Sequence, residues 1–87
     1  MANIGTLPPA PARMLVVGDY TVHAIPTGRG GRFTATLEHK GRSILGIGSE
    51  RDARTAITAI ALACMKGSAP MHELGVKILD KLQRSSI

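Results

Sequence analysis

Aromatic side chains are nearly absent from this sequence, which contains one Phe, one Tyr and no Trp among its 87 residues. Large rings therefore cannot fill the interior, and the core has to be aliphatic and closely packed. A chain of this length forms one domain and buries only about 60–65% of the surface that its unfolded form exposes. Its stability is therefore marginal, and we expect either a monomer or a homodimer.

Cysteine is also scarce, because Cys64 is the only one. A single thiol excludes a disulfide framework and a zinc site built from thiolates. Long hydrophobic runs are missing as well, so no segment predicts a bilayer-spanning helix. Residues 1–13 contain three prolines and no apolar stretch typical of a secretory signal. We therefore predict a cytoplasmic protein without a membrane partner, in a bacterial host if a phage encodes it.

The residues that enzymes and cofactor sites require do not gather in this sequence. The three histidines, His23, His39 and His72, lack the spacing of metal ligands. Cys64 falls within an apolar helical stripe, which is typical of a small buried hydrophobe and not of a nucleophile. Arg51 stands where the dinucleotide fingerprint needs its third glycine. We predict no enzymatic activity, no metal and no cofactor.

Acidic residues are few relative to basic ones, six against eleven, which gives a net charge of +5. Such a balance favours an acidic partner, either nucleic acid or an acidic protein surface.

Residues 1–13 have no hydrophobic period and are predicted to form a flexible arm before a single domain at 14–87. Two apolar runs follow, at 14–17 and 20–25, with Gly18-Asp19 between them. That dipeptide predicts either a type II′ hairpin turn or a bulge in one bent strand. Pro26, which has no N–H to donate, ends the second run.

Residues 32–66 predict strand, turn, strand and helix. Apolar residues alternate with polar ones over 33–38 and again over 43–47. A three-residue turn, His39-Lys40-Gly41, places the apolar residues of the first strand and the alternate residues from Ser43 of the second on one face of the sheet. It leaves Ile44 on the other face. The residues expected on the inner face are Phe33, Ala35, Leu37, Ser43, Leu45 and Ile47.

Two helices complete the predicted domain. Ser49 is expected to cap the first helix, with Asp52 in its first turn. Leu62 and Met65 lie opposite its main apolar stripe and need cover. A second helix, opened by Pro70, is expected to supply that cover or to form a dimer contact. The predicted stripes are Ala53, Ile57, Ile60 and Cys64 on the first helix, and Met71, Leu74, Gly75, Ile78, Leu79 and Leu82 on the second.

These elements predict an α+β fold in which a three- or four-stranded antiparallel sheet carries two α-helices packed on one face. The glycine-rich loop at 27–31 carries Arg29 and is the best candidate for a basic contact loop. The residues predicted to contact a protein partner are Arg29, Arg32, Lys40, Arg42 and Ile44.

Residues 33–65 resemble the second half of a double-stranded RNA-binding domain. The residues that carry this likeness are Phe33, Leu37, Gly41, Gly46, Gly48 and Ser49, followed by an alanine-rich helix. The lysine-rich helix start of that family is replaced by residues 50–54, which include two acids. The same element order is similar to the sheet-reading DNA-binding domains of phage integrases, which would place Arg32, Arg42 and the Thr34/Thr36 face on the groove. Both likenesses imply nucleic-acid binding, for which the candidate residues are Arg29, Arg32, Arg42, Ser49, Arg51 and Arg54.

A third resemblance covers more of the chain. A strand ending near Pro26, a glycine-rich loop, a Lys-Gly hairpin, an alanine-rich helix and the segment 67–70 look like the layout of small phage anti-CRISPR proteins that inhibit type I interference complexes. This likeness of size and layout implies a non-catalytic inhibitor or adaptor that binds a Cas subunit. We take that as the leading function and nucleic-acid binding as its alternative.

Overall fold

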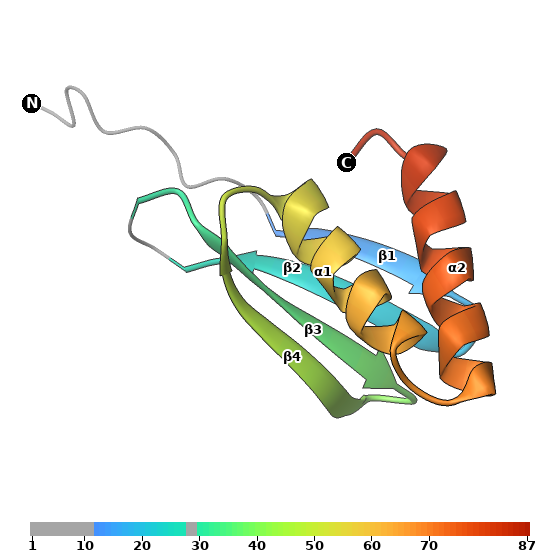
Figure 1. Ribbon diagram of the computed structural model, residues 1–87. Helices are drawn as coiled ribbons and strands as arrows, with labels where there is room; N and C mark the ends of the chain where they lie inside the picture. The colour runs from blue at the N-terminus through green and yellow to red at the C-terminus, as the bar shows by residue number, and fades with distance from the viewer. Residues whose placement is uncertain (1–11, 28–29) are drawn as a thin grey trace, which may run out of the picture.

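The computed structural model describes residues 12–27 and 30–87, which form four consecutive strands followed by two helices (Figure 1). The strands are β1 (Arg13–Val17), β2 (Tyr20–Pro26), β3 (Phe33–His39) and β4 (Arg42–Glu50). They form one antiparallel sheet in the order β1-β2-β3-β4. Helices α1 (Ala53–Met65) and α2 (Ala69–Gln83) both lie in front of this sheet in Figure 1. The predicted α+β class, with both helices on one face, is confirmed.

The hydrophobic core lies between the inner face of the sheet and the two helices. Its fully buried side chains include Val22, Leu37, Ile57, Ile60 and Ile78, which come from β2, β3, α1 and α2. Leu45 and Ile47 of the edge strand β4 are half-buried against this cluster. No described polar or charged residue is buried.

The β1–β2 connection is a two-residue hairpin turn. Val17 pairs with Tyr20, and Gly18 has a φ of +59° whereas Asp19 stays at negative φ. These are the φ signs of a type II′ turn. Arg13, the last residue of the predicted arm, pairs with Ala24 as the first residue of β1.

The β3–β4 turn and the register both differ from the prediction, but Leu45 and Ile47 keep their predicted inner face. His39 pairs with Arg42, so the turn has two residues, Lys40 and Gly41, with φ of +52° and +83°. Positive φ at both positions is typical of a type I′ turn. The pairing then shifts between Leu37 and Glu38, so that Leu45 lies opposite Leu37. The bulge at Ile44 returns Leu45 and Ile47 to the inner face. Ser43, which was expected on that face, instead pairs with Glu38 and points to the opposite one, because it precedes the bulge.

Helix α1 begins later than predicted, because Asp52 and not Ser49 is its N-cap. The Asp52 carboxylate accepts a hydrogen bond from the Thr55 backbone N–H at 2.7 Å. Ser49 and Glu50 are still part of β4, and Glu50 pairs with Phe33. The expected cap at Ser49 is therefore wrong, because the strand continues past it.

Removing the Asp52 cap is expected to lower thermal stability, especially near neutral pH. The hydrogen bond from the Thr55 backbone lowers the pKa of Asp52 below its ordinary value. Its stabilising effect is therefore complete above the unfolded pKa of about 4 and is lost as pH falls through the lower folded pKa. We expect Asp52→Ala to reduce the melting temperature at neutral pH and to leave a shallower loss of stability in acid.

Circular dichroism melts from neutral to acidic pH test this expectation. Asp52→Asn is the matched control, because its amide oxygen still accepts from Thr55 but does not titrate. It should melt between the parent and the alanine variant at neutral pH and share the shallower acid dependence. An acid profile identical to that of the parent in both variants would contradict the assigned role of the carboxylate.

The second helix packs on the first, as predicted. Leu74, Gly75, Ile78 and Leu82 of α2 are buried, and Lys77–Glu73 and Arg84–Asp80 form exposed i,i+4 ion pairs of 3.3 Å each. Leu62, however, remains 48% exposed, so α2 does not provide the cover expected for it. The α1–α2 contact runs instead along Ala61, Cys64 and Met65, which approach Gly75.

Candidate functional site

The face of the sheet that points away from the helices carries four of the six large, exposed hydrophobic side chains among the described residues. These are Met14 (58% exposed), Val16 (42%), Ile25 (45%) and Ile44 (48%). Strand alternation places them there, because their neighbours Leu15, Ala24 and Leu45 point to the core side. We call this surface the open sheet face.

One row of residues crosses the middle of the open sheet face. Its members come from all four strands and are Met14, His23, Thr36 and Gly46. The Glu38 carboxylate of this face has a hydrogen-bond partner, because His23 Nε2 lies 3.1 Å from its Oε1. A partner that covers the face therefore does not leave this carboxylate without a hydrogen bond.

The predicted contact residues do not form one site. Ile44 lies on the open sheet face, beside Glu38, because of the bulge in β4. Arg32 precedes β3 at one end of the sheet, whereas Lys40 and Arg42 belong to the hairpin at the other end. Seven residues of β3 separate these ends, or about 20 Å of extended chain. Arg29 falls outside the described residues.

Arg42 also lies on the other side of the sheet from Ile44. It pairs with His39, whose ring stacks on Tyr20 with a centroid separation of 4.4 Å. Tyr20 packs against the core, so this row points towards the helices. Regular strand alternation would put Arg42 and Ile44 on the same face of the sheet. The bulge in β4 puts them on opposite faces instead.

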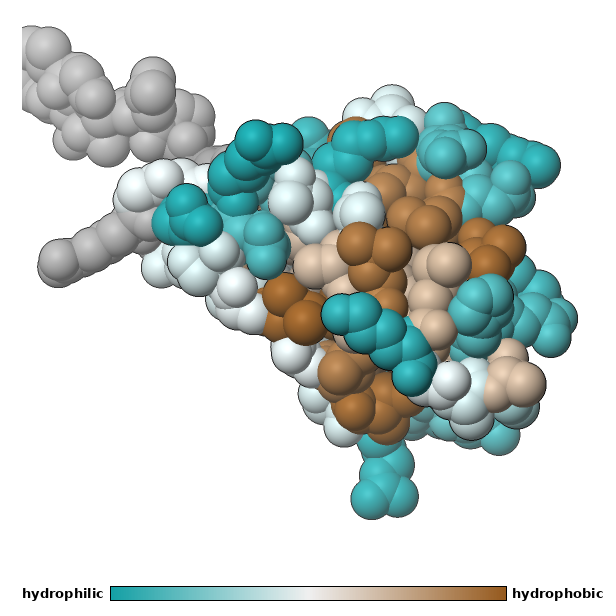
Figure 2. Space-filling model, viewed as in Figure 1, coloured by the Kyte–Doolittle hydropathy of each residue, from teal (hydrophilic) through white to brown (hydrophobic). Residues whose placement is uncertain are grey.

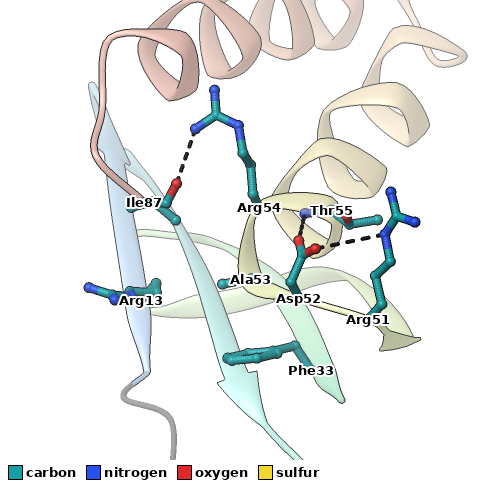
Figure 3. A pocket seen from close by; sticks show the side chains of 8 residues that line it. All are labelled: Arg13, Phe33, Arg51, Asp52, Ala53, Arg54, Thr55 and Ile87. Atoms are coloured by element: carbon teal, nitrogen blue, oxygen red, sulfur yellow. Dashed lines mark hydrogen bonds and ion pairs between the residues drawn. The ribbon is translucent and has the colours of Figure 1, made fainter. Parts of the chain in front are cut away.

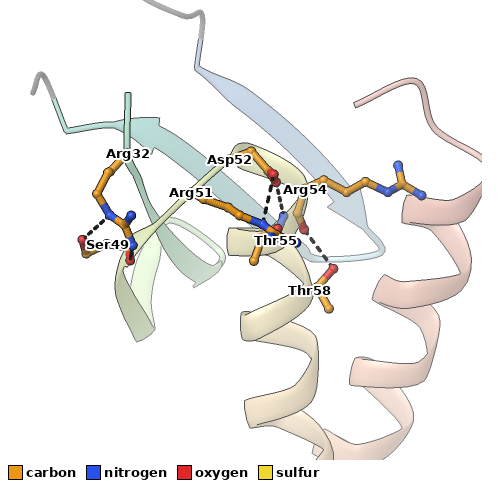
Figure 4. A network of polar contacts seen from close by, with 7 residues as sticks. All are labelled: Arg32, Ser49, Arg51, Asp52, Arg54, Thr55 and Thr58. Atoms are coloured by element: carbon orange, nitrogen blue, oxygen red, sulfur yellow. Dashed lines mark hydrogen bonds and ion pairs between the residues drawn. The ribbon is translucent and has the colours of Figure 1, made fainter. Parts of the chain in front are cut away.

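The structure changes the roles of two residues proposed for nucleic-acid binding. Arg32 donates to Ser49 through Nε to Oγ (2.8 Å) and through Nη2 to the carbonyl oxygen (2.6 Å). Figure 4 shows the Arg32 guanidinium reaching Ser49. Ser49 has a φ of +55° and lies at a register shift between β3 and β4. Ser49 therefore accepts from Arg32 across the sheet, and it lies in β4 and not at the start of α1.

Arginines from separate parts of the chain line a cavity of about 520 Å³ on the helix side of the sheet. Figure 3 shows Arg13 of β1 on one side of Phe33 and Ala53, Arg51 on the other, and Arg54 reaching towards Ile87. Phe33 and Ala53 are 7% and 8% exposed, so they form a closed apolar floor. We call this feature the arginine cavity.

The arginine cavity combines four residues that the sequence assigned to three different categories. Arg51 and Arg54 were nucleic-acid candidates, Phe33 was a core residue, and Arg13 was part of the arm. The signal that joins them is the pairing of Arg13 with Ala24, which brings the start of β1 beside the end of β2 and the start of β3. That pairing cannot be read from residues 1–13 alone.

The helix side also exposes hydrophobic residues. Figure 2 shows hydrophobic side chains over the helices, bordered by charged ones. Leu62 of α1 and Val76 of α2 are 48% and 45% exposed there. These two residues provide controls for the open sheet face, because their exposure matches that of Ile44 and Ile25.

The single thiol is part of the core. Cys64 is 2% exposed, and burial raises the pKa of its thiol. A protonated, buried thiol is a poor nucleophile. Among the described residues, no group of three His, Cys, Asp or Glu side chains is placed to hold a metal ion. Neither described helix is long and apolar enough to cross a membrane.

Comparison of the chain with protein-family models, with curated proteins and with solved structures gives no match. The function is therefore inferred from the arrangement of its own residues.

Proposed function

We propose that this chain is a small non-catalytic binding protein of phage or mobile-element type, which docks through its open sheet face on a protein of a nucleic-acid-processing complex. A type I Cas complex is the partner class, and blocking that complex is the outcome. The observation that carries the proposal is that Met14, Val16, Ile25 and Ile44 are all exposed on a face that the helices do not cover. An uncovered sheet face that exposes large apolar side chains favours an interaction surface.

The charges at the ends of the open sheet face define the chemistry of the partner. Arg32 lies at one end, and Lys40 lies at the other beside Asp19, whose carbonyl accepts from the Lys40 backbone N–H. The chain as a whole carries +5. An apolar protein surface bordered by acidic groups is therefore complementary to this face, and electrostatic attraction would speed its association.

The dimensions of the face support a contact that includes these ends. Four strands spaced about 4.8 Å apart, each about 20 Å long, give a projected area of roughly 400 Å². A standard protein interface buries about 800 Å² on each partner. The basic ends therefore have to take part in a stable contact.

A second copy of the chain fits this face less well. Two sheets that pack face to face keep their strands roughly aligned, so the ends of one sheet lie over the ends of the other. Either direction of alignment brings basic ends together, Arg32 or Lys40 against Arg32 or Lys40. The repulsion disfavours a homodimer through this face.

Replacing Ile44 with aspartate is expected to weaken partner binding by about tenfold or more, because docking would bury an unpaired charge that acidic groups also repel. The measurement is biolayer interferometry on immobilised, purified type I Cas complexes. Leu62→Asp is the control, since Leu62 is equally exposed at 48% but lies on a helix. It should bind like the parent.

Two outcomes would contradict the proposal. One is unchanged binding by Ile44→Asp together with lost binding by Leu62→Asp, which would move the interface to the helices. The other is that the parent binds none of the complexes. Circular dichroism melts establish that both variants are folded before they are compared.

A further inference from the structure

We infer that the arginine cavity is a second binding site, separate from the open sheet face, and that its ligand carries a phosphate group. It lies on the helix side of the sheet, between β1, β3 and the start of α1. The proposed protein contact uses the opposite side. A variant that loses binding at one site can therefore keep binding at the other.

The charge of the cavity favours an anion. Its eight lining residues include three arginines, Arg13, Arg51 and Arg54, and one acid, Asp52. That acid already has partners, because it accepts from the Thr55 N–H at 2.7 Å and lies 3.7 Å from Arg51 Nε. The cavity is therefore lined by more basic than acidic side chains.

The guanidinium groups are anchored but not used up. Arg54 Nη1 donates to the Ile87 carbonyl oxygen at 3.1 Å, which fixes the direction of the side chain. A guanidinium has five N–H donors, so the others stay available to an oxyanion. Arg51 is held only at the long distance to Asp52, and its side chain is 80% exposed. Arginines positioned in this way suit the several oxygens of a phosphate.

The floor and size of the cavity add a second element of recognition. Phe33 and Ala53 present a nearly closed apolar surface between the arginines (Figure 3). A volume of about 520 Å³ is in the range that small organic ligands occupy. The site therefore accommodates a phosphate with an organic group attached, such as a nucleotide or one unit of a nucleic acid strand.

The site does not depend on the end of helix α1 alone. The first turn of α1 is already capped, because Asp52 accepts the Thr55 N–H. The inference stands on the side chains of β1, of the β4–α1 junction and of α1 that meet at one cavity.

The test compares two variants of equal charge. In the first, Arg13, Arg51 and Arg54 are each replaced by Gln. In the control, Arg42, Lys66 and Lys77 are each replaced by Gln, which removes the same charge from exposed positions outside the cavity. Both variants carry a net charge of +2, because three positive charges are removed from +5.

The probes are inorganic pyrophosphate, adenosine monophosphate and a single-stranded DNA of about twelve nucleotides. Binding is followed by amide chemical shifts in ¹⁵N-labelled full-length protein and, for DNA, by fluorescence anisotropy in a salt titration. We expect shifts at Ala53 and Thr55, an affinity loss of about tenfold or more in the cavity variant and less than about twofold in the control.

The probes also distinguish the source of the phosphate. Binding of the nucleotide as tight as that of DNA would assign a free phosphate compound. Much tighter binding of DNA than of the nucleotide would assign a nucleic acid strand. In that case the logarithm of the association constant should fall, per decade of salt concentration, by no more than about 0.7 for each of the three arginines. Equal losses in the two variants, or no shift at Ala53 and Thr55 with any probe, would overturn the site.

Discussion

The Ile60→Ala variant is expected to lose about 2–5 kcal/mol of unfolding free energy, because it leaves a cavity in the core. Ile60 is fully buried in the cluster formed by the sheet and both helices. Unfolding free energies of about 0.05–0.15 kcal/mol per residue predict a total of roughly 4–13 kcal/mol for a chain of this length. A single buried isoleucine therefore accounts for a large part of the stability.

Urea denaturation followed by circular dichroism measures this loss. Leu62→Ala is the matched control, because it removes a similar side chain from the same helix at a position that is 48% exposed. It should stay within about 0.5 kcal/mol of the parent. A loss in Leu62→Ala equal to that in Ile60→Ala would mean that α1 does not face the sheet as described.

The second large effect is expected at Gly75, where alanine should destabilise the protein even though it favours helix formation. A β-carbon at this position would lie 2.5 Å from the Ala61 carbonyl oxygen and 2.6 Å from Met65 Cγ. The methionine side chain can move, but the backbone oxygen can yield only if α1 and α2 separate. Overpacking of this kind costs about 1–3 kcal/mol, whereas the gain in helix propensity is about 1 kcal/mol.

We therefore expect Gly75→Ala to lower the unfolding free energy by up to about 2 kcal/mol. Val76→Ala is the control at the next position, since Val76 is 45% exposed and its replacement also favours helix. Thermal and urea denaturation of both variants test the difference. If Gly75→Ala is more stable than the parent, the two helices are not in the close contact that the structure shows.

The fold could be predicted largely because hydrophobic alternation and helical stripes are local signals. The inner row Phe33, Ala35 and Leu37 and the helical stripe through Ile57 and Ile60 are buried as expected. The β3–β4 turn shows the limit of such signals. The sequence favours a three-residue turn because it keeps the apolar residues of both strands on the inner face. A two-residue turn with a bulge at Ile44 also keeps Leu45 and Ile47 there, but with other partners and with Ser43 on the opposite face.

The candidate sites were less predictable, because they depend on contacts between distant parts of the chain. The start of α1 was placed at Ser49, whereas Arg32 and the continuing strand hold Ser49 in the sheet. Arg13 was assigned to the arm, so the arginine cavity could not be foreseen. Three basic residues predicted to contact one partner lie near opposite ends of β3, with Arg32 before the strand and Lys40 and Arg42 after it.

The order of elements along the chain has a consequence for synthesis. Each of β2, β3 and β4 pairs with the strand made just before it, and α1 packs over strands made earlier. The contact between β1 and α2, in contrast, can form only after α2 has been synthesised. Lys81 of α2 donates to the carbonyl oxygen of Val16 and so occupies part of the free edge of β1. Unpaired strand edges invite pairing with other chains, above all while a protein is incompletely folded. Helix α2 is thus made after all four strands and shields β1, and a nascent chain stalled before α2 carries the edge of β1 unprotected.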